Sequence, residues 1–521
     1  MTETGRTAPD IKSGAVRSDR GSEFGASAPM RGQRAVIYAD RPQPNVGRHA
    51  NTGQGETPVM QQTRPGTARY HTGHGVSALL CAGLLSCLLG APGSSLAAAS
   101  TPAEGADVAG PGSGPSLDLR YRYEFLQDAL YLKDAHASTL RARLGYRSKP
   151  VVGTRATIEI EGVGVAGADQ YRNTVDPNPG YPFIPDPPDY AVNQAYLAFT
   201  TPVGISMNIG RQRLAFDNER HIGPDMWRQK ERTFDSLRVE SRLLEEVNFE
   251  TLVSDIHFTY AYVMKVGQND FEERSLEAHL MNLSFAMWPS QRTHISFYGY
   301  FVDDNEPHNI HDLTSSTIGW YYERLYRPEM GKVKIILEYA KQDTYQGRNG
   351  YLADPGFLNK DTYHTNAAVN IRWPKGLSAE AGYQVFTSQS RIYMDSLGNI
   401  STLWYGFQTP LGSNHAFNGW SDLIVPGLVD WQYTTPKYGL KDLSLGLSGP
   451  LWGLGWQATY HSFQQFDGSP FGNDYGTEVD ALLSRDLTKT SRMGIMLAQY
   501  SAANLATSDV TRAALYFEIS Y

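Results

Sequence analysis

The sequence predicts an all-β fold, a transmembrane antiparallel β-barrel of about 18 strands with short periplasmic turns and long outer loops. From residue 117 to the C-terminus, apolar and polar residues alternate with a period of two, which is typical of strands that separate two media. After the first hundred residues no apolar run is long enough for a membrane-spanning helix. The last strand ends on an aromatic residue, Tyr521.

The composition narrows the function classes. The 521 residues include 31 Tyr and 50 Gly, and the net charge is −8. After residue 99 the chain holds 36 Lys and Arg against 48 Asp and Glu, a net charge of −12, so nucleic acid is not expected as a partner. Both cysteines, Cys81 and Cys87, precede the predicted barrel, which therefore has no disulfide of its own.

The first 116 residues divide into three segments. Residues 1–59 are rich in Gly, Pro, Arg, Ser and Thr, and are predicted to be disordered or to lie upstream of the true start codon. Residues 60–99 have the pattern of a signal peptide, with basic residues before the apolar run at 76–90 and Ala97-x-Ala99 near the expected cleavage point. A membrane anchor is the alternative, but an apolar run of about 15 residues is short for one. Residues 100–116 are predicted to be a flexible N-terminus.

The barrel wall is assigned from residue 117 to residue 521. In the second predicted strand, apolar residues point one way while Arg141 and Arg143 point the other, and in the third strand Arg155 shares its face with two glutamates. A soluble β-sandwich also alternates, but several charges on one face of each strand favour lipid on one side and water on the other. Alternation places eighteen strands near 117–125, 139–147, 154–162, 191–200, 203–211, 233–243, 255–266, 275–287, 292–302, 315–325, 332–341, 363–373, 377–387, 438–448, 454–463, 476–485, 490–500 and 512–521.

The lengths of the connections alternate along the predicted barrel. Short segments such as TPVG and WPKG follow the even-numbered strands, whereas the segments after the odd-numbered strands are longer. This sorting is typical of outer-membrane barrels, and an even number of strands returns the C-terminus to the periplasmic side. The aromatic last strand resembles a signal for the outer-membrane assembly machinery.

Arginine is concentrated in the stretch 203–242, between two predicted strands. Guanidinium groups in a narrow pore attract anions and bind carboxylates in a forked geometry. A lipid-facing arginine costs about 2–4 kcal/mol at mid-membrane, so strand arginines are expected to face the lumen. A solvated, self-neutralising loop is the alternative. We predict a constriction whose anion-binding residues are Arg141, Arg143, Arg155, Arg211, Arg213, Arg220, Arg228, Arg232, Arg238 and Arg242, with Asp217, Asp235 and Glu240 as acidic partners.

Two blocks of motifs lie in and beyond this stretch. The first holds Gly210-Arg211-Gln212-Arg213, Asp217-Asn218-x-Arg220, Trp227-Arg228-Gln229 and Thr233-Phe234-Asp235-x-x-Arg238. The second holds Phe407-Gln408-Thr409-Pro410, His415, Phe417-Asn418-Gly419-Trp420-Ser421-Asp422 and Asp442-Leu443. Together they resemble the alginate export family of outer-membrane β-barrel channels. The resemblance implies a monomeric, porin-like barrel of eighteen strands whose arginine-rich pore passes an anionic uronate polymer, and His221 departs from it where an aromatic residue is expected.

Several predicted outer loops carry weaker candidates. The acidic run 303–306 offers oxygen ligands for Ca²⁺ or for a bridge to lipopolysaccharide, with a plain charged loop as the alternative. His308, His311 and His415 are expected to be solvated loop residues rather than metal ligands. The proline-rich stretch 176–189 is expected to be a stiff loop that lies across the mouth. No resident cofactor or metal is expected.

These patterns favour a passive, anion-selective channel in the outer membrane of a Gram-negative bacterium. The expected partners are outer-membrane lipid and lipopolysaccharide, the assembly machinery, and an anionic poly- or oligosaccharide or small anions. A general or substrate-specific uptake porin for small anions or sugars is the first alternative, because arginines do not encode direction. An outer-membrane enzyme is disfavoured, since His461 and Ser462 point to opposite faces of their strand and no nucleophile and base are otherwise paired.

Overall fold

The structure is a computed structural model. It describes residues 112–244, 253–269, 272–287, 293–304, 314–343, 361–394, 400–423, 438–469, 472–503 and 507–521, all within one compact unit, His74–Tyr521. The segments predicted as an extension (1–59), a signal peptide (60–99) and most of the flexible N-terminus (100–116) lie outside these residues. Among the described residues, no helix is long and apolar enough to cross a membrane.

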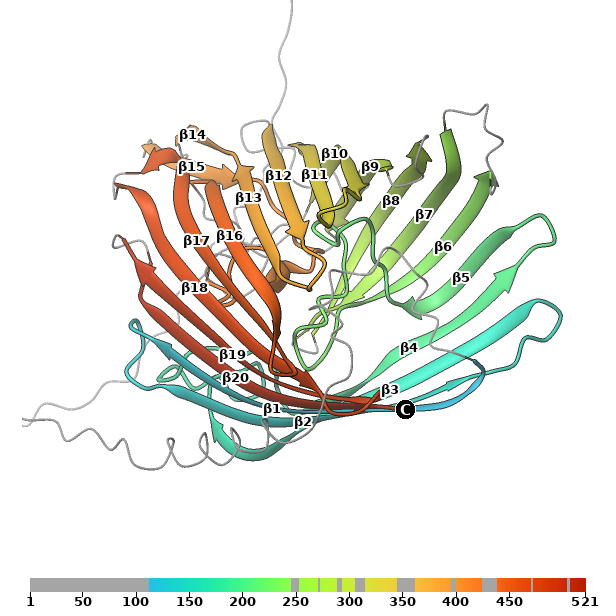
Figure 1. The fold of residues 1–521 in the computed structure, drawn as a ribbon, viewed down its shortest axis with the longest axis horizontal. Helices are drawn as coiled ribbons and strands as arrows, with labels where there is room; N and C mark the ends of the chain where they lie inside the picture. Colours follow the sequence, from blue (N-terminus) through green and yellow to red (C-terminus); the bar gives the residue numbers. More distant parts are fainter. Residues whose placement is uncertain are drawn as a thin grey trace, which may run out of the picture. The chain divides into compact units, whose positions relative to one another are not determined.

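The wall is an eighteen-stranded antiparallel sheet in which each strand pairs with its neighbours around the barrel (Figure 1). The predicted fold class and all eighteen predicted strands are confirmed; most ends shift by at most four residues, but the third and fifteenth strands continue eight and six residues beyond their predicted ends. The strands are β1 (Gly114–Asp128), β2 (Ala135–Arg147), β3 (Thr154–Gln170), β4 (Asp189–Thr200), β5 (Ile205–Gln212), β6 (Thr233–Leu244), β7 (Val253–Gly267), β8 (Glu273–Met287), β9 (Thr293–Asp304), β10 (Ser315–Tyr326), β11 (Lys332–Asp343), β12 (Thr362–Arg372), β13 (Ser378–Phe386), β16 (Leu440–Leu451), β17 (Leu454–Ser469), β18 (Gly472–Asp486), β19 (Ser491–Ala502) and β20 (Val510–Ser520).

The sheet closes on itself between its first and last strands. β1 pairs with β20 in antiparallel register from Asp118 opposite Ser520 to Asp128 opposite Val510. Within the sheet, β13 pairs with β16 across the longest connection. Closure leaves no free strand edge, which a membrane barrel requires because lipid offers no hydrogen-bonding partner to an unpaired backbone.

The two faces of the wall are inverted relative to a soluble protein. On β2 the outward Leu140 and Leu144 are 43% and 56% exposed, whereas the inward Arg141 and Arg143 are 2% and 4% exposed. The same alternation exposes Ile158 and Ile160 on β3, whereas Glu161 on this strand is buried. Apolar side chains therefore face the medium outside, and charged side chains are packed in the interior, as expected for lipid outside and polar contents inside.

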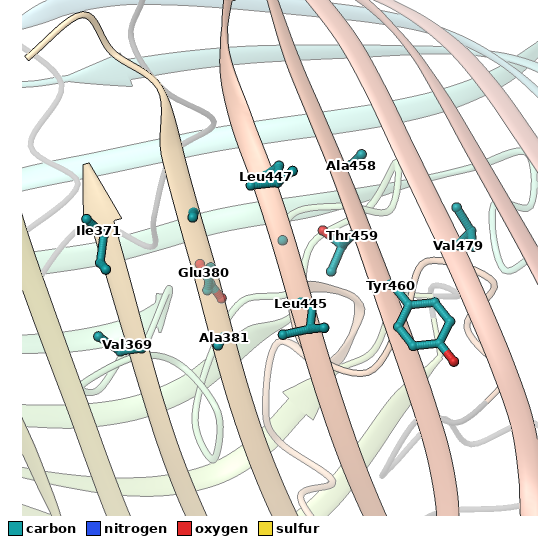
Figure 2. A pocket seen from close by; sticks show the side chains of 12 residues that line it. Val369, Ile371, Glu380, Ala381, Leu445, Leu447, Ala458, Thr459, Tyr460 and Val479 are labelled. Atoms are coloured by element: carbon teal, nitrogen blue, oxygen red, sulfur yellow. The ribbon is translucent and has the colours of Figure 1, made fainter. Parts of the chain in front are cut away.

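The outer face also has a shallow apolar hollow where small residues interrupt the larger ones. Ala381 and Ala458 lie among Leu445, Leu447 and Tyr460, on neighbouring strands between β12 and β18 (Figure 2). Such a surface has no polar partner to offer and fits contact with acyl chains.

The predicted sorting of the connections by length is only partly right. The connections 171–188, 213–232, 344–361 and 387–439 are long and follow odd-numbered strands of the predicted order. However, only residues 470–471 separate β17 from β18, because both strands continue through residues that were expected to form a loop. The connections 129–134 and 148–153 have the same length, although a long and a short one were predicted.

The connection between β13 and β16 contains a hairpin that sequence alternation did not predict. Its strands are β14 (Ser388–Met394) and β15 (Ile400–Gly406), which pair only with each other in a separate two-stranded sheet. Short strands outside the wall have no lipid-facing side, so they lack the alternation that identified the others. Beyond the hairpin the chain continues through the 3₁₀ turn η1 (Asn414–Ala416).

Two segments occupy the interior of the barrel. We call residues 213–232, between β5 and β6, the inner loop, and residues 407–423, after β15, the inner arm. They join in a parallel bridge between Ile222 and Leu411, supported by a 2.8 Å hydrogen bond from the amide of Gly223 to the carbonyl of Leu411. Their apolar residues belong to the buried cluster that forms the core. The two motif blocks found in the sequence thus meet inside the barrel.

Candidate functional site

β5 is much shorter than its neighbouring strands and ends at Gln212. The chain therefore leaves the wall early, and the inner loop turns inward. Asp217 and Glu219 then adopt left-handed backbone conformations, with φ of 50° and 64°. This conformation is uncommon for residues other than glycine and turns the chain sharply. The chain is therefore redirected from the wall into the lumen.

The inner loop reaches the wall at β8 and β9. The carboxylate of Asp217 accepts hydrogen bonds from Asn282 at 2.8 Å and from Ser296 at 2.5 Å, and His294 lies 3.4 Å away. Asp217 was predicted to be a partner of the pore arginines; among the described residues it contacts this polar set and no arginine. It anchors the first half of the inner loop.

Arginines of β1 and β2 hold the second half through its backbone. Arg120 donates to the carbonyls of Met226 and Arg228 at 3.0 Å each and to that of Trp227 at 3.3 Å. Arg122 also donates to the Trp227 carbonyl, and Arg141 donates to that of Gln229 at 3.1 Å. Buried loop carbonyls need donors that a regular ladder does not supply. Arg120, Arg122 and Arg141 supply them here.

A charged network continues along the same wall. Arg143 bonds Glu161 at 2.8 Å and reaches Glu231 of the inner loop at 3.3 Å, and Arg213 bonds Glu231 on its other side. Arg213 also lies 3.1 Å from Glu159. Burial opposes ionisation of Glu231, but Arg143 and Arg213 outweigh it and lower its pKa to about 2. The inner loop is thereby bound to β2 and β3 by side chains as well as by its backbone.

Arg228 links the inner loop to the inner arm. It lies 2.5 Å from Asp422 and 3.4 Å from Glu124 of β1, and Arg512 of β20 bonds the same Asp422. Burial alone would lower the pKa of Arg228, but Glu124 and Asp422 raise it above its ordinary value. His415 approaches Asp422 to 2.6 Å.

His415 was expected to be a solvated loop residue, and that expectation is wrong. Its ring stacks on Trp227 at 4.1 Å with an interplanar angle of 2°, and its side chain is 11% exposed. Burial lowers the pKa of His415, in opposition to Asp422. The histidine is enclosed because the inner arm folds into the lumen instead of extending outward.

Arg220 and Arg232 are held by neutral groups. The Arg220 guanidinium lies between the rings of Phe386 and Phe417, at 4.6 and 4.5 Å, and donates to Gln384 at 2.9 Å. Burial lowers the pKa of Arg220 to about 9. Arg232 donates to the carbonyls of Gly223 and Gly412, at 3.3 and 2.7 Å. Both arginines thus hold the inner loop against the inner arm.

The remaining predicted arginines lie on the wall. Arg211 forms a forked pair with Asp235 at 2.7 and 2.9 Å, and it also reaches Glu273. Arg238 bonds Glu240, two residues along β6, and both are partly accessible. Arg242 is exposed and Arg155 is half-buried. Among the described residues no ion pair involves Arg155.

Several functional residues were not among the predicted site residues. Asp186, in the proline-rich connection expected to lie across the mouth, is buried and bonds Arg122 at 3.0 Å and the amide of Gln229 at 2.8 Å. Glu124 and Arg512 occupy inward positions of β1 and β20. Glu124 and Arg512 could have been identified from the alternation of their strands, which places them on the charged, inward face. No sequence pattern near Asp186 indicates that it is buried.

The predicted Ca²⁺ ligands fall partly outside the described residues. Asp303 and Asp304 end β9 and are buried, and Asp304 is paired with Arg274 of β8. The rest of that acidic run, with His308 and His311, lies outside the described residues.

Comparisons with known proteins agree with this architecture. The model of the alginate export family matches residues 116–317. No curated protein matches the sequence. OccAB4 of Acinetobacter baumannii is similar in structure, with a TM-score of 0.53 and 12% identity over 79% of this chain and 99% of that one. OccK9 (OpdG) of Pseudomonas aeruginosa gives 0.54 and 10% over 78% and 98%.

A third solved structure, OpdK of Pseudomonas aeruginosa with vanillate, gives a TM-score of 0.50 and 12% identity over 79% of this chain and 100% of that one. At these identities the likeness concerns the fold. The family match covers the first motif block, from β1 to β10, and confirms the resemblance seen in the sequence. The chain thus forms a closed barrel of eighteen strands with the fold of outer-membrane porins, and it is similar over residues 116–317 to the alginate export family.

Proposed function

We propose that this protein is a passive outer-membrane channel whose passage is constricted by the inner loop and the inner arm. The observation that carries the proposal is the course of the inner loop, which is held at β8 and β9 by Asp217 and at β1 and β2 by Arg120 and Arg141. A loop that crosses the lumen between these two parts of the wall narrows the passage through the barrel. No bond is made or broken in this function.

We infer that the passing solute is anionic. The reason is that some of the predicted arginines are occupied by partners within the protein and others lie apart from the inner loop. Those of the inner loop are matched by buried carboxylates and carbonyls, so a passing anion would have to displace an existing partner. We call Arg155, Arg238 and Arg242 the wall arginines; they are half-buried or exposed on inward-facing positions of β3 and β6. None of the inner-loop contacts described above involves them, and cations that line a passage attract anions without trapping them.

The solute class we favour is an anionic polysaccharide of the uronate type that moves outward. The match of residues 116–317 to the alginate export family supports this choice. Uptake of small anions is the second candidate, and the observation in its favour is that OpdK, which has a similar fold, was solved with vanillate. Both candidates use the same constriction, since a passive pore follows the gradient.

The same reasoning leads us to propose a non-catalytic protein of the Gram-negative outer membrane. The outward apolar face would contact lipid and lipopolysaccharide, and the aromatic last strand would be read by the assembly machinery. Closure of the sheet within a single chain fits a monomer. The buried His461 faces Asp442 at 3.0 Å, while Ser462 points to the other face of β17, so this pair does not form a hydrolase site.

Planar-bilayer recording tests the proposal. We expect the purified protein to form a channel of small conductance that is selective for chloride over potassium, and to be blocked by uronate oligomers added to one side. Neutral oligosaccharides of equal length serve as the control for simple obstruction. Cation selectivity, or equal block by charged and neutral oligomers, would contradict the proposed anionic passage.

A comparison of solute sizes separates the two candidates. If the channel serves polymer export, liposomes that contain it should release uronate oligomers as well as monomeric uronate. If it serves uptake of small anions, only the monomers should pass.

A further inference from the structure

A buried cluster of two imidazoles and a carboxylate lies where the inner loop meets the wall. It consists of His221 of the inner loop, Glu338 of β11 and His364 of β12. One nitrogen or oxygen from each residue lies within 4.8 Å of the others, and all three residues are buried. The residues are distant in sequence, so the cluster exists only in the folded barrel.

His364 is the feature of this cluster that calls for a ligand. Its side chain is fully buried, and neither of its two ring nitrogens has a hydrogen-bonding partner. Its ring stacks on Phe386 at 4.3 Å and meets the ring of His221 edge-on at 5.5 Å. A buried polar ring without partners is costly to leave unsatisfied. The aromatic contacts nevertheless fix the ring next to His221 and Glu338.

The surroundings of Glu338 orient its carboxylate toward the two histidines. The hydroxyl of Tyr298 donates to one carboxylate oxygen at 2.9 Å, and the side-chain amide of Asn218 donates to the other at 3.3 Å. His221 Nε2 lies 3.1 Å from Glu338 Oε1. Carboxylates that bind metals are commonly held by such outer hydrogen bonds, which fix the orientation of the ligand.

We propose that His221, Glu338 and His364 bind a Zn²⁺ ion that ties the inner loop to β11 and β12. Two histidines and one carboxylate are an established donor set for Zn²⁺, with water in the fourth position. Zinc bonds of about 2.0–2.1 Å place tetrahedral donors about 3.4 Å apart. The separations in the cluster, from 3.1 Å to at most 4.8 Å, span this value, so modest side-chain movement completes the site.

One positive charge near the cluster works against a cation, and it is already engaged. Arg220 precedes His221 in the chain and directs its guanidinium to Gln384 and Asn418, at 2.9 and 2.5 Å, between two aromatic rings. Glu338 supplies the negative charge within the cluster. The alternative arrangement is an ion pair between a protonated His221 and Glu338, with His364 neutral and no metal.

Metal titration distinguishes these arrangements. The full chain is purified with a tag that contains no histidine, stripped with EDTA, and titrated with Zn²⁺; bound zinc is then measured by mass spectrometry after gel filtration. We expect one equivalent of tightly bound zinc, and a visible absorption band of tetrahedral Co²⁺ when cobalt replaces it. We expect His364→Phe and His221→Phe to weaken zinc binding by at least tenfold.

Two further variants make the result decisive. His279→Phe removes a histidine of β8 that is outside the cluster and should leave zinc binding unchanged. His364→Phe places a third phenyl ring beside Phe386 and Phe407, so the barrel should form, and the shift of folded barrels on unheated gels verifies this. Zinc should raise the unfolding temperature of the unmodified chain and not that of His364→Phe. Absence of stoichiometric zinc, or equal binding by His364→Phe, would overturn the proposal.

Discussion

Eight of the ten predicted pore arginines fall into two regions, for which we expect different roles. One set lies in or against the inner loop and is buried, with each guanidinium matched by carboxylates, carbonyls or aromatic rings. The wall arginines lie on β3 and β6, closer to solvent and with fewer partners. The buried set consists of Arg141, Arg143, Arg220, Arg228 and Arg232, and the wall set of Arg155, Arg238 and Arg242. We therefore expect one residue type to serve two purposes, which sequence alone did not separate.

The difference follows from the cost of burying charge. A guanidinium removed from water must be paired, and a pair inside protein is held far more strongly than one at a surface. Arg228 and its acids illustrate the first case, and Arg242, which is exposed, the second. The buried set thus holds the inner loop in place, and we expect the wall set to attract the solute.

The largest effect is expected from Arg228→Ala. The replacement leaves Glu124 and Asp422 buried without this partner, which should cost about 3–5 kcal/mol and release the inner loop from the inner arm. Single-channel recordings should show a larger conductance and frequent open events. Arg242→Ala is the matched control and should leave the conductance unchanged. An unaltered conductance in Arg228→Ala would show that the inner loop is held without it.

A second replacement tests the contact between the inner loop and the inner arm without removing any charge. A Cβ on Gly412 would lie 2.1 Å from the carbonyl oxygen of Arg220, so Gly412→Ala must push the two segments apart, at a cost of about 1–3 kcal/mol. Limited proteolysis should cut within residues 213–232 faster than in the unmodified protein. Gly164→Ala on β3, where a Cβ meets nothing within 4 Å, should leave the rate of cleavage unchanged.

A pH effect is expected from Asp225 in the buried region. Burial raises its pKa from 3.8 to about 6. Between pH 3.8 and about pH 6, the packed inner loop therefore holds a proton on Asp225 that the released loop has lost. The packed state is therefore favoured at low pH and loses up to roughly 3 kcal/mol as the pH rises through 6. Channel opening should be more frequent at pH 7 than at pH 5.

Asp225→Asn isolates this contribution from the other groups that titrate in the same range. Burial also raises the pKa of Glu219, which acts in the same direction, and lowers that of His415, which acts in the opposite one. The variant should open less often than the unmodified channel at pH 7 and equally often at pH 4. If its dependence on pH matches that of the unmodified channel, Asp225 is not the responsible group.

The smallest effect is expected from single replacements of the wall arginines. Arg155→Gln removes a cation that has no ion pair among the described residues, so it should lower chloride selectivity by less than twofold and leave conductance and stability unchanged. Reversal potentials across a salt gradient measure the change. A strong loss of folded protein would instead place Arg155 with the buried set.

The wall could be predicted from the sequence, because alternation with a period of two survives wherever one side meets lipid. The alternation of Leu140 with Arg141 placed β2 within four residues of its ends, and that of Ile158 with Glu159 placed the start of β3, although β3 continues eight residues further than predicted. The hairpin of β14 and β15 was missed, since it belongs to no lipid-facing surface. The continuation of β17 and β18 was missed because its polar residues resemble a loop.

The interior could be predicted only in part. The arginine-rich inner loop was found by its charge, but the partners of Arg228 come from residues 124 and 422, which no local pattern brings together. The burial of His415 and the meeting of His221 with His364 likewise depend on how the inner arm and inner loop cross the lumen. Such contacts form only when the barrel has closed around the inner loop and the inner arm, so the sequence of a single strand does not reveal them.

Reversal potentials of two variants, recorded under one salt gradient, decide between the two roles. In the first variant, Arg155, Arg238 and Arg242 are all replaced by Gln; in the second, only Arg228 is replaced by Gln. We predict that the first loses anion selectivity at nearly normal conductance, whereas the second gains conductance and keeps most of its selectivity. Full selectivity in the triple variant, with its loss in Arg228→Gln, would contradict this division of the arginines.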